Sequence, residues 1–225
     1  MFTFEKNQCM LKIQEFVFNP FEENTYLVYD ETREAVIIDP GCYEQEEKKE
    51  LEDFIENNRL KVTMLLNTHG HIDHVLGNSF VKERFKVKLY IHKIDEPVMR
   101  AVKAYAGNYG FPMYQEASVD DYLEEGNSVT FGSQQFRILF VPGHSPGHVA
   151  FYNEKEKVVI GGDVLFHNSI GRTDLPGGNF DTLINSIHEK LFTLPDDVVV
   201  YPGHGPSTTI GFEKVTNPFC ALTSN

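Results

Sequence analysis

The chain alternates short apolar runs with charged or Gly/Pro-rich stretches, the pattern of short strands joined by turns. In the first half, the apolar runs predict neighbouring strands at residues 10–18, 25–29, 35–38 and 62–66. The second half repeats the pattern, with strands predicted at residues 128–130, 135–141, 149–152, 158–160 and 198–201. The chain is therefore expected to be rich in β-structure in both halves.

Three segments instead carry apolar residues at helical spacing and predict amphipathic helices at 44–57, 94–105 and 180–191. The apolar positions are Leu51, Phe54 and Ile55 in the first, Val98, Met99 and Val102 in the second, and Leu183, Ile184, Ile187 and Leu191 in the third. These stripes are expected to face a core. Periodicity alone thus predicts an α/β protein in which helices pack on sheets.

The segment 68–74, Thr-His-Gly-His-Ile-Asp-His, places three histidines and an aspartate within six positions, directly after a predicted strand. Side chains two positions apart in an extended chain share a face, so His69 and His71 should point the same way. Asp73 and His74 follow where the chain turns and should address a second point. Because burying so many imidazoles without a cation would strand several nitrogen atoms, the segment indicates a metal site with room for two ions.

Zinc takes about four ligands, so two sites require partners from elsewhere in the chain. Three further predicted strands end in a Gly/Pro turn that carries one His or Asp: His144 in Pro-Gly-His-Ser-Pro-Gly-His, Asp163 in Gly-Gly-Asp and His204 in Pro-Gly-His-Gly-Pro. Taken singly, Asp163 could cap the next segment and His204 could sit in a plain turn. Together with the cluster at 69–74, they predict a site at one edge of a sheet.

In order and spacing, these motifs resemble the metallo-β-lactamase superfamily over nearly the whole chain. The resemblance implies a four-layer αββα sandwich, with residues 1–225 forming a single domain. It also implies two Zn²⁺ ions per chain, with Fe or Mn as alternative metals. Carried over position by position, it assigns His69, His71 and His144 to one metal and Asp73, His74 and His204 to the other, with Asp163 bridging both.

The same resemblance gives two residues a supporting role. His148 becomes a second, structural histidine, because the family's ligand in that turn is the first one, His144. Asp39, in Ile-Ile-Asp-Pro-Gly, matches an early aspartate that supports the histidine loop in the family. A plain turn-forming Asp-Pro-Gly is an equally good interpretation of Asp39.

Composition narrows the function. The formal net charge of -13, from 20 basic and 33 acidic residues among 225, argues against a nucleic-acid partner and against the nuclease branch of the family. The three cysteines, Cys9, Cys42 and Cys220, are widely spaced and suggest neither a disulfide framework nor a thiolate site. There is no signal-peptide pattern and no apolar run of membrane-spanning length. A cytoplasmic protein without a membrane partner is expected.

Comparison of branches within the family depends on single positions. True metallo-β-lactamases carry Cys or Ser where Asp163 stands, and flavodiiron-type members carry Glu in place of His71. Acyl-homoserine lactonases share all seven ligands but have a Tyr where Phe166 stands, which makes a lactonase the minor alternative. The segments 19–26, 169–178 and 205–211 most resemble the glyoxalase II group, particularly its short single-domain bacterial members.

Two departures bear on the substrate. The sequence ends about twenty residues after His204, so we expect no counterpart of the helical domain that contacts glutathione in full-length glyoxalase II. A Lys and a Tyr that contact glutathione in that group become Arg172 and Asp174. Arg172 could bind a substrate carboxylate through two hydrogen bonds, or it could form a structural ion pair with Asp174.

The resemblance implies hydrolysis of a small-molecule acyl-thiol, of the S-D-lactoylglutathione type or a related thioester, with Asp73 and Asp163 as the catalytic carboxylates. Two zinc ions would activate a water molecule for attack on the acyl carbonyl. The first rival is an iron-dependent persulfide dioxygenase, whose single metal would use His69, His144 and Asp163. The second is a non-catalytic binding protein, which a complete set of ligands disfavours.

Overall fold

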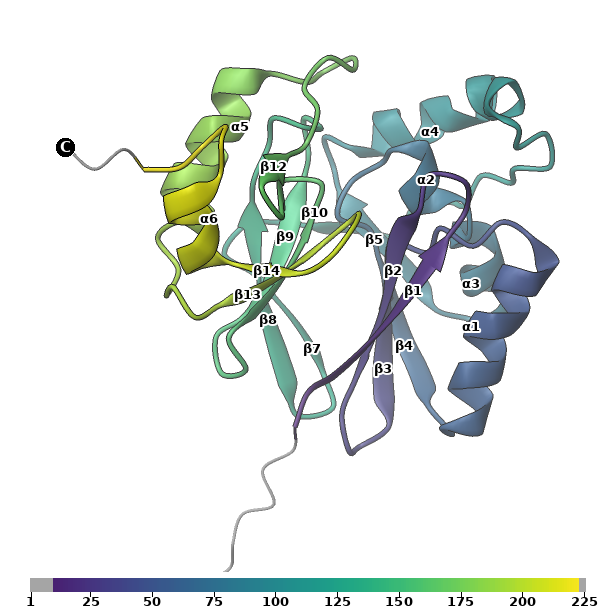
Figure 1. Ribbon diagram of the computed structural model, residues 1–225. Helices are drawn as coiled ribbons and strands as arrows, with labels where there is room; N and C mark the ends of the chain where they lie inside the picture. The colour runs from purple at the N-terminus through teal and green to yellow at the C-terminus, as the bar shows by residue number, and fades with distance from the viewer. Residues whose placement is uncertain (1–9, 223–225) are drawn as a thin grey trace, which may run out of the picture.

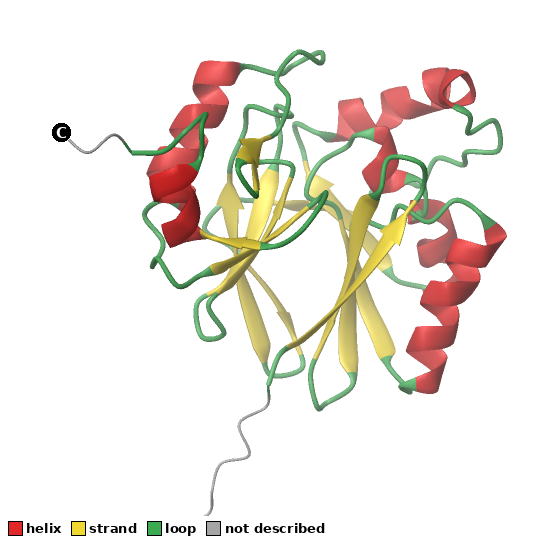
Figure 2. Ribbon diagram, viewed as in Figure 1, coloured by secondary structure: helices red, strands yellow, loops and turns green. Residues whose placement is uncertain are grey.

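The computed structural model describes residues 10–222 and shows two β-sheets packed face to face, with helices on both outer faces (Figures 1 and 2). The first sheet has the order β1-β2-β3-β4-β5-β6. Its strands are β1 (Lys12–Phe18), β2 (Glu23–Tyr29), β3 (Glu34–Ile38), β4 (Lys61–Leu66), β5 (Lys88–His92) and β6 (Asp121–Leu123). The pairs from β1 to β3 are antiparallel, and those from β3 to β6 are parallel.

The second sheet has the order β14-β13-β10-β9-β8-β7. Its strands are β7 (Ser128–Phe131), β8 (Gln134–Phe140), β9 (Val149–Asn153), β10 (Val158–Gly162), β13 (Val199–Pro202) and β14 (Thr208–Thr209). Only the pair β10·β13 is parallel. A separate two-stranded ribbon joins β11 (Leu165–Phe166) to β12 (Ser169–Ile170).

The helices form the outer layers (Figures 1 and 2). Covering the first sheet are α1 (Gln45–Asn57), α2 (Ile72–Val75), α3 (Asn78–Phe85), α4 (Glu96–Tyr105) and the 3₁₀ turn η1 (Ala106–Tyr109). Covering the second are α5 (Phe180–Ser186), the π-helical turn η2 (Ile187–Leu191) and α6 (Ile210–Thr216). The predicted four-layer αββα sandwich is confirmed.

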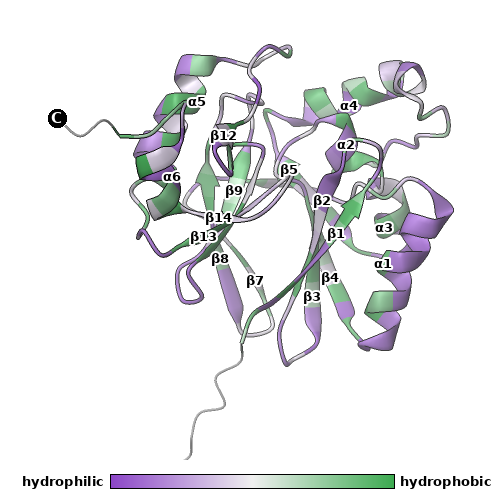
Figure 3. Cartoon of the chain, in the orientation of Figure 1, coloured by the Kyte–Doolittle hydropathy of each residue, from purple (hydrophilic) through white to green (hydrophobic). Residues whose placement is uncertain are grey.

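Three apolar clusters correspond to the three interfaces between the four layers. Strand β2 shows how alternation separates them: Tyr26 and Val28 face the second sheet, whereas Leu27 faces the helices of its own half. The cluster between α5 and the second sheet includes Leu183 and Ile187. Figure 3 shows the corresponding colours, with hydrophobic strands inside and helices that are hydrophilic on their outer sides.

Local signals place the helix starts. A capping box between Glu44 and Glu47 begins α1, in which Leu51 and Ile55 are buried. The side chain of Asn179 accepts a hydrogen bond from the Thr182 amide at the start of α5, 2.9 Å long. Both caps lie at the predicted starts of their helices.

The predicted helices and strands are present with small shifts in their ends. The helix predicted over 94–105 begins two residues later, after Asp95, and the one predicted over 180–191 changes to π-helical geometry at Ile187. Nine of the described elements were not predicted: α2, α3, α6, η1, β5, β6, β11, β12 and β14. Each is short, between two and eight residues, and so offers too few positions for a periodic pattern to stand out.

The described cysteines, Cys42 and Cys220, are buried free thiols, and Cys9 lies outside the described residues. Within residues 10–222, no helix has both the length and the apolar character needed to cross a membrane.

Asp30 joins the two halves at the end of the sandwich formed by the hairpins β2–β3 and β7–β8 (Figure 1). Its carboxylate is buried and accepts hydrogen bonds from the Ser133 amide (2.8 Å) and hydroxyl (2.7 Å). It also accepts hydrogen bonds from the amide and hydroxyl of Thr32. Burial raises the pKa of Asp30, but the hydrogen bonds from Ser133 and Thr32 outweigh it and lower the pKa to about 2.

Replacing Asp30 with alanine should lower the free energy of unfolding at pH 7 by about 2–3 kcal/mol, because buried donors lose a charged acceptor. The folded-state pKa of Asp30 lies below the unfolded value of about 3.9, so its contribution is complete above pH ~4 and is lost as the pH falls towards 2. Urea unfolding of the metal-free protein at pH 7 and pH 2.5 measures this. The control Asp53→Ala removes an exposed ion pair with Lys49 and should leave the free energy of unfolding almost unchanged. A pH-independent difference for Asp30→Ala would contradict the assignment.

Candidate metal centre

The candidate ligands come together between the two sheets, although they are spread over 136 positions of the sequence from His69 to His204, counted inclusively. Strand β4 leads to the His69 loop and α2, and β8 leads to His144. Strands β10 and β13 lead directly to Asp163 and His204. Loops from both halves of the sandwich therefore bring the candidate ligands together.

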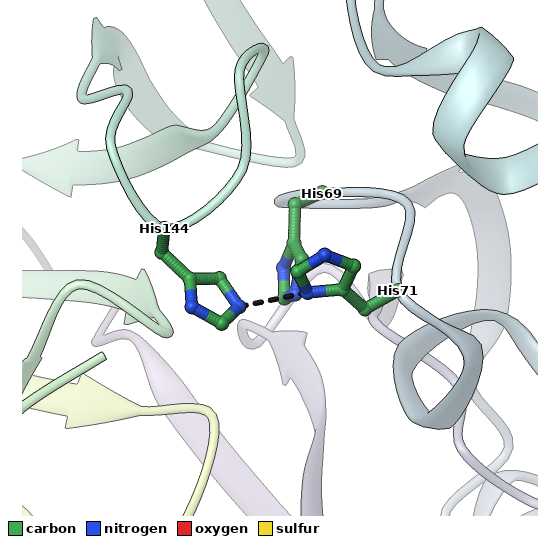
Figure 4. A group of neighbouring side chains, drawn as sticks. All are labelled: His69, His71 and His144. Atoms are coloured by element: carbon green, nitrogen blue, oxygen red, sulfur yellow. Dashed lines mark hydrogen bonds between the residues drawn. The ribbon is translucent and has the colours of Figure 1, made fainter. Parts of the chain in front are cut away.

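The first group consists of His69, His71 and His144, whose candidate ligand atoms all lie within 4.8 Å of one another. Figure 4 shows the three rings converging, with a dashed line from His71 Nδ1 to His144 Nε2, 2.8 Å long. The other ring nitrogen of His144 lies 2.8 Å from the Arg172 carbonyl oxygen. Since Nδ1 of His144 donates there, its Nε2 is left with a lone pair that points into the group.

The second group consists of Asp73, His74 and His204. The turn of α2 carries the first two, and His204 Nε2 lies 3.2 Å from Asp73 Oδ2. The outward nitrogen of each histidine again has a partner: His204 Nδ1 lies 3.0 Å from the Phe21 carbonyl oxygen, and His74 Nδ1 lies 3.3 Å from Asp39 Oδ2. These contacts aim both Nε2 atoms at the interior of the group.

Asp163 lies between the two groups. Its Oδ2 is 3.5 Å from His144 Nε2 in the first group and 3.5 Å from His204 Nε2 in the second. Its Oδ1 is 3.4 Å from His74 Nε2. The carboxylate thus contacts histidines of both groups, which is the position that a bridging ligand requires.

Asp39, His69 and His74 form a third close group. Asp39, however, accepts hydrogen bonds from the Thr68 amide (2.7 Å) and hydroxyl (2.6 Å) as well as facing His74. The same Thr68 hydroxyl lies 3.0 Å from His69 Nδ1. Asp39 therefore lies behind the histidines and orients them, with its lone pairs already in use.

Buried atoms without partners test whether this donor set fits a metal. Among the described residues, His69 Nε2, His74 Nε2 and Asp163 Oδ1 are buried and make no hydrogen bond. Such groups are costly unless something else satisfies them. Since all are lone-pair donors of the kind that zinc and iron bind, the residues fit a metal centre.

Burial sets the protonation of the first group. It lowers the pKa of His69 well below the usual range, and the nearby His74 lowers it further. Burial also lowers the pKa of His71 to about 4, with His144 adding to the effect. Both imidazoles are therefore neutral at pH 7, the form that binds a metal.

Opposite charges lie side by side in the second group and at Asp163. Burial raises the pKa of Asp163, but the charge of His74 and the hydrogen bond from His204 outweigh it and hold this pKa well below its usual range. Burial lowers the pKa of His204, but hydrogen bonds to Asp163 and Asp73 outweigh it and raise this pKa to about 10. The carboxylates of Asp73 and Asp163 require positive charge beside them. A divalent ion would supply this charge in place of the protons on His74 and His204.

Glycines allow the backbone to come this close. A Cβ atom on Gly203 would lie 2.1 Å from Asp163 Oδ1. Gly162 has φ +51, and a Cβ there would lie 2.5 Å from the Thr68 hydroxyl. Any larger residue at either position would displace the strand ends that carry Asp163 and His204.

His148 is buried beside the first group without belonging to it. Its ring stacks on His69, with centroids 4.7 Å apart, and its Nε2 accepts a hydrogen bond of 3.0 Å from the Asp163 amide. His148 therefore holds the backbone of Asp163 in place and packs against a second candidate ligand.

Asp95, at the start of α4, was not singled out from the sequence. Its carboxylate accepts hydrogen bonds from the Gly70 amide (2.6 Å), the Gly147 amide (2.7 Å) and the Ser145 hydroxyl (2.7 Å). Gly70 lies between His69 and His71, whereas Ser145 follows His144. Asp95 thus ties together the two loops that carry the first group. The helix start before Glu96-Pro97 is the one local signal that could have indicated it.

Glu23 was also missed. It is fully buried at the start of β2, accepts a hydrogen bond of 2.9 Å from the Thr25 hydroxyl, and has Oε1 3.7 Å from His74 Nδ1. Burial raises the pKa of Glu23 well above its usual range, although His74 opposes the shift. No sequence pattern marks this residue, because its contact with His74 arises only from the packing of β2 against α2.

A cleft of about 870 Å³ opens above the candidate ligands. His71, Asp73, His144, Asp163 and His204 lie among its lining residues. The loop 169–178 contributes Arg172 to the lining. Arg172 donates two hydrogen bonds to Asp174, of 2.7 and 2.8 Å, so the ion pair predicted as its alternative role is present.

Comparison with known proteins identifies the family of this chain. The family model described as "Metallo-beta-lactamase superfamily" matches residues 18–204. The hydroxyacylglutathione hydrolase GloC of Haemophilus influenzae is 40% identical over 201 residues, which cover 88% of this chain and 93% of that protein.

Two solved structures show the same similarity in three dimensions. The BLEG-1 B3 metallo-β-lactamase superposes with a TM-score of 0.82 at 37% identity, covering 94% of this chain and 99% of its own. TTHA1623 in a di-iron-bound form superposes with a TM-score of 0.80 at 38% identity, covering 92% and 99%.

The family match includes every candidate ligand, from His69 to His204, and the similarity to GloC extends over nearly the full length of both chains. The two groups of candidate ligands are brought together by loops from both halves of the matching fold. The chain belongs to the metallo-β-lactamase superfamily and is a metallo-hydrolase of that family.

Proposed function

We propose that the protein is a binuclear zinc thioesterase that hydrolyses small acyl-thiol substrates in the manner of glyoxalase II. The observation that carries the proposal is the pair of His/Asp groups joined by Asp163 at the base of an open cleft. The similarity to a protein named hydroxyacylglutathione hydrolase supports a thioester as the bond that is cleaved.

In this proposal, His69, His71 and His144 would hold one metal, Asp73, His74 and His204 would hold the other, and Asp163 would contribute to both. When bound, the two ions supply Lewis-acid chemistry: they activate water near neutral pH and stabilise negative charge on the carbonyl oxygen and the leaving thiolate. The assignment is supported by the buried, unpartnered Nε2 atoms of His69 and His74.

The chain's own residues position the reactants. Asp73 and Asp163 reach the base of the cleft and provide the carboxylates that can hold a proton from the attacking water. Phe166 lines the same cleft and lies against His204, with ring centroids 6.2 Å apart. Because a phenyl ring has no hydroxyl to assist ring opening, Phe166 disfavours the lactonase alternative.

The buried free thiols of Cys42 and Cys220 support a reducing, cytoplasmic setting for this enzyme. We therefore propose that it acts on thiol conjugates present in that compartment.

The test combines metal analysis with a substrate panel. Protein purified without added metal should contain about two zinc ions per chain and should hydrolyse thioesters in preference to a lactone or a β-lactam. The β-lactam is included because one similar structure is described as a B3 metallo-β-lactamase, and iron is quantified because another holds two irons. One iron per chain with oxygen consumption on a persulfide would overturn the proposal in favour of the dioxygenase.

A further inference from the structure

The walls of the cleft are apolar, and each half of the sandwich supplies one. Pro97, Val98 and Ala101 come from α4 on the first half. Ile170, Leu175 and Pro176 come from the loop that follows the bridging carboxylate, on the second half. Polar groups are concentrated at the base, where the candidate ligands lie. A ligand entering the cleft therefore passes between two hydrocarbon surfaces before it reaches the reacting groups.

Aromatic rings form the rim. Phe21, in the turn before β2, is 40% exposed, and Tyr109, in η1, is 57% exposed. Both line the cleft, and their ring centroids lie 6.4 Å apart. Phe21 is backed by Phe111, at 6.0 Å. Aromatic surface left exposed at the mouth of a cleft is available to an apolar ligand.

Apart from its base, the cleft offers few positively charged groups to an anion. Among the described residues that line it, Arg172 alone is a lysine or arginine. Its guanidinium donates two hydrogen bonds, both to Asp174, and this pair is exposed, with side-chain exposures of 61% and 69%. A substrate carboxylate that approached Arg172 would meet the charge of Asp174 as well. The positive charge at the mouth is therefore locally cancelled.

We infer that the cleft selects its substrate by an uncharged apolar group, aliphatic or aromatic, bound between α4 and the loop 169–178, and not by the carboxylates of an anionic thiol. The substrate class is then a thioester with several carbon atoms of hydrocarbon next to the reacting bond. This inference rests on the proposed thioesterase activity for the bond that is cleaved, but the binding preference of the cleft can be measured without any turnover.

The experiment compares stable thioethers, which cannot be hydrolysed, on the purified protein by isothermal titration calorimetry. S-propyl-, S-butyl- and S-hexyl-N-acetylcysteamine are neutral, and S-hexylglutathione carries the same hydrocarbon on an anionic thiol. The neutral S-hexyl compound should bind at least as tightly as S-hexylglutathione. Affinity in the neutral series should rise by about threefold to fourfold per added methylene. Tighter binding of S-hexylglutathione, or no gain with chain length, would overturn the inference.

Two variants on one helix locate the binding surface. Ala101 and Ala104 are both exposed on α4, but only Ala101 lines the cleft. Ala101→Asp should weaken binding of S-hexyl-N-acetylcysteamine by about tenfold or more, because it places a charge against the hydrocarbon chain. Ala104→Asp should leave binding unchanged. An equal effect of the two substitutions would show that the hydrocarbon binds elsewhere.

Substitution of Arg172 tests whether the cleft recognises a carboxylate. Arg172→Ala should leave the affinity for S-hexylglutathione within about twofold of wild type, since Asp174 already neutralises the charge of Arg172. A large loss specific to the glutathione compound would show that Arg172 recognises a carboxylate, which contradicts the inference. Absence of thioester hydrolysis together with the expected binding pattern would instead refute the proposed function and leave the binding preference standing.

Discussion

Replacing Asp163 with alanine should remove both metal ions and nearly all hydrolysis. The carboxylate contacts histidines of both groups, at 3.4 and 3.5 Å, and supplies negative charge at the centre of the site. In the proposed centre, losing it would remove a ligand from each ion and leave two cations facing each other with less charge between them. We expect kcat/KM to fall by ~10³-fold or more, as the loss of several kcal/mol of transition-state stabilisation implies.

Elemental analysis after dialysis against metal-free buffer measures the first part of this prediction. Asp197→Ala is the matched control, because Asp197 precedes β13 and pairs with Lys157 at an exposed site. The control should retain about two metal ions and full activity. Near-normal metal content in Asp163→Ala would show that Asp163 does not bridge.

Replacing Asp95 with alanine should weaken metal binding about 10–100-fold, although Asp95 is not itself a proposed ligand. Its carboxylate holds the Gly70 amide in one ligand loop and the Ser145 hydroxyl and Gly147 amide in the other. Without it, His69, His71 and His144 lose the link that fixes their relative positions, which is the effect expected of partners behind a metal's own ligands. Unfolding free energy should also fall by about 2–3 kcal/mol, because buried donors are left unsatisfied.

The control Asp30→Ala distinguishes loss of ligand positioning from loss of folding stability. Asp30 is likewise a buried carboxylate that accepts hydrogen bonds from amides and hydroxyls across the two halves, but it lies between the β2–β3 and β7–β8 hairpins. Both variants should lose similar stability, whereas only Asp95→Ala should lose metal affinity in a competition titration with a chelator. Equal metal affinities in the two variants would rule out the positioning role.

The candidate ligands could be proposed from the sequence because each is part of a local motif at the end of a strand that is itself apolar enough to recognise. The supporting contacts could not. Asp95 is 25 positions from Gly70 and 50 from Ser145, and nothing in the residues around it reports these contacts. Such links appear only when the layers have packed.

The two roles considered for Arg172 show a different limit of prediction from the sequence. Arg172 and Asp174 are two positions apart, so an ion pair was an evident alternative from the sequence. Only geometry shows that both carboxylate oxygens of Asp174 accept from Arg172. Likewise, the apolar positions of α4 were expected to face the core. Met99 and Val102 do so, whereas Val98 lines the cleft. A hydrophobic stripe does not report which part of it remains open to a ligand.

Asp30 and Asp95 both bridge the halves of the sandwich through hydrogen bonds alone, Asp30 to Ser133 and Asp95 to Ser145. The cradle for the ions is thereby assembled by the polypeptide itself, unlike a zinc finger, whose folding free energy comes from its metal. We therefore expect folding and metal capture to be successive events, so that the completed protein would exchange one divalent ion for another without passing through an unfolded state. Supply and ligand chemistry after folding would then decide which metal a cell loads into it.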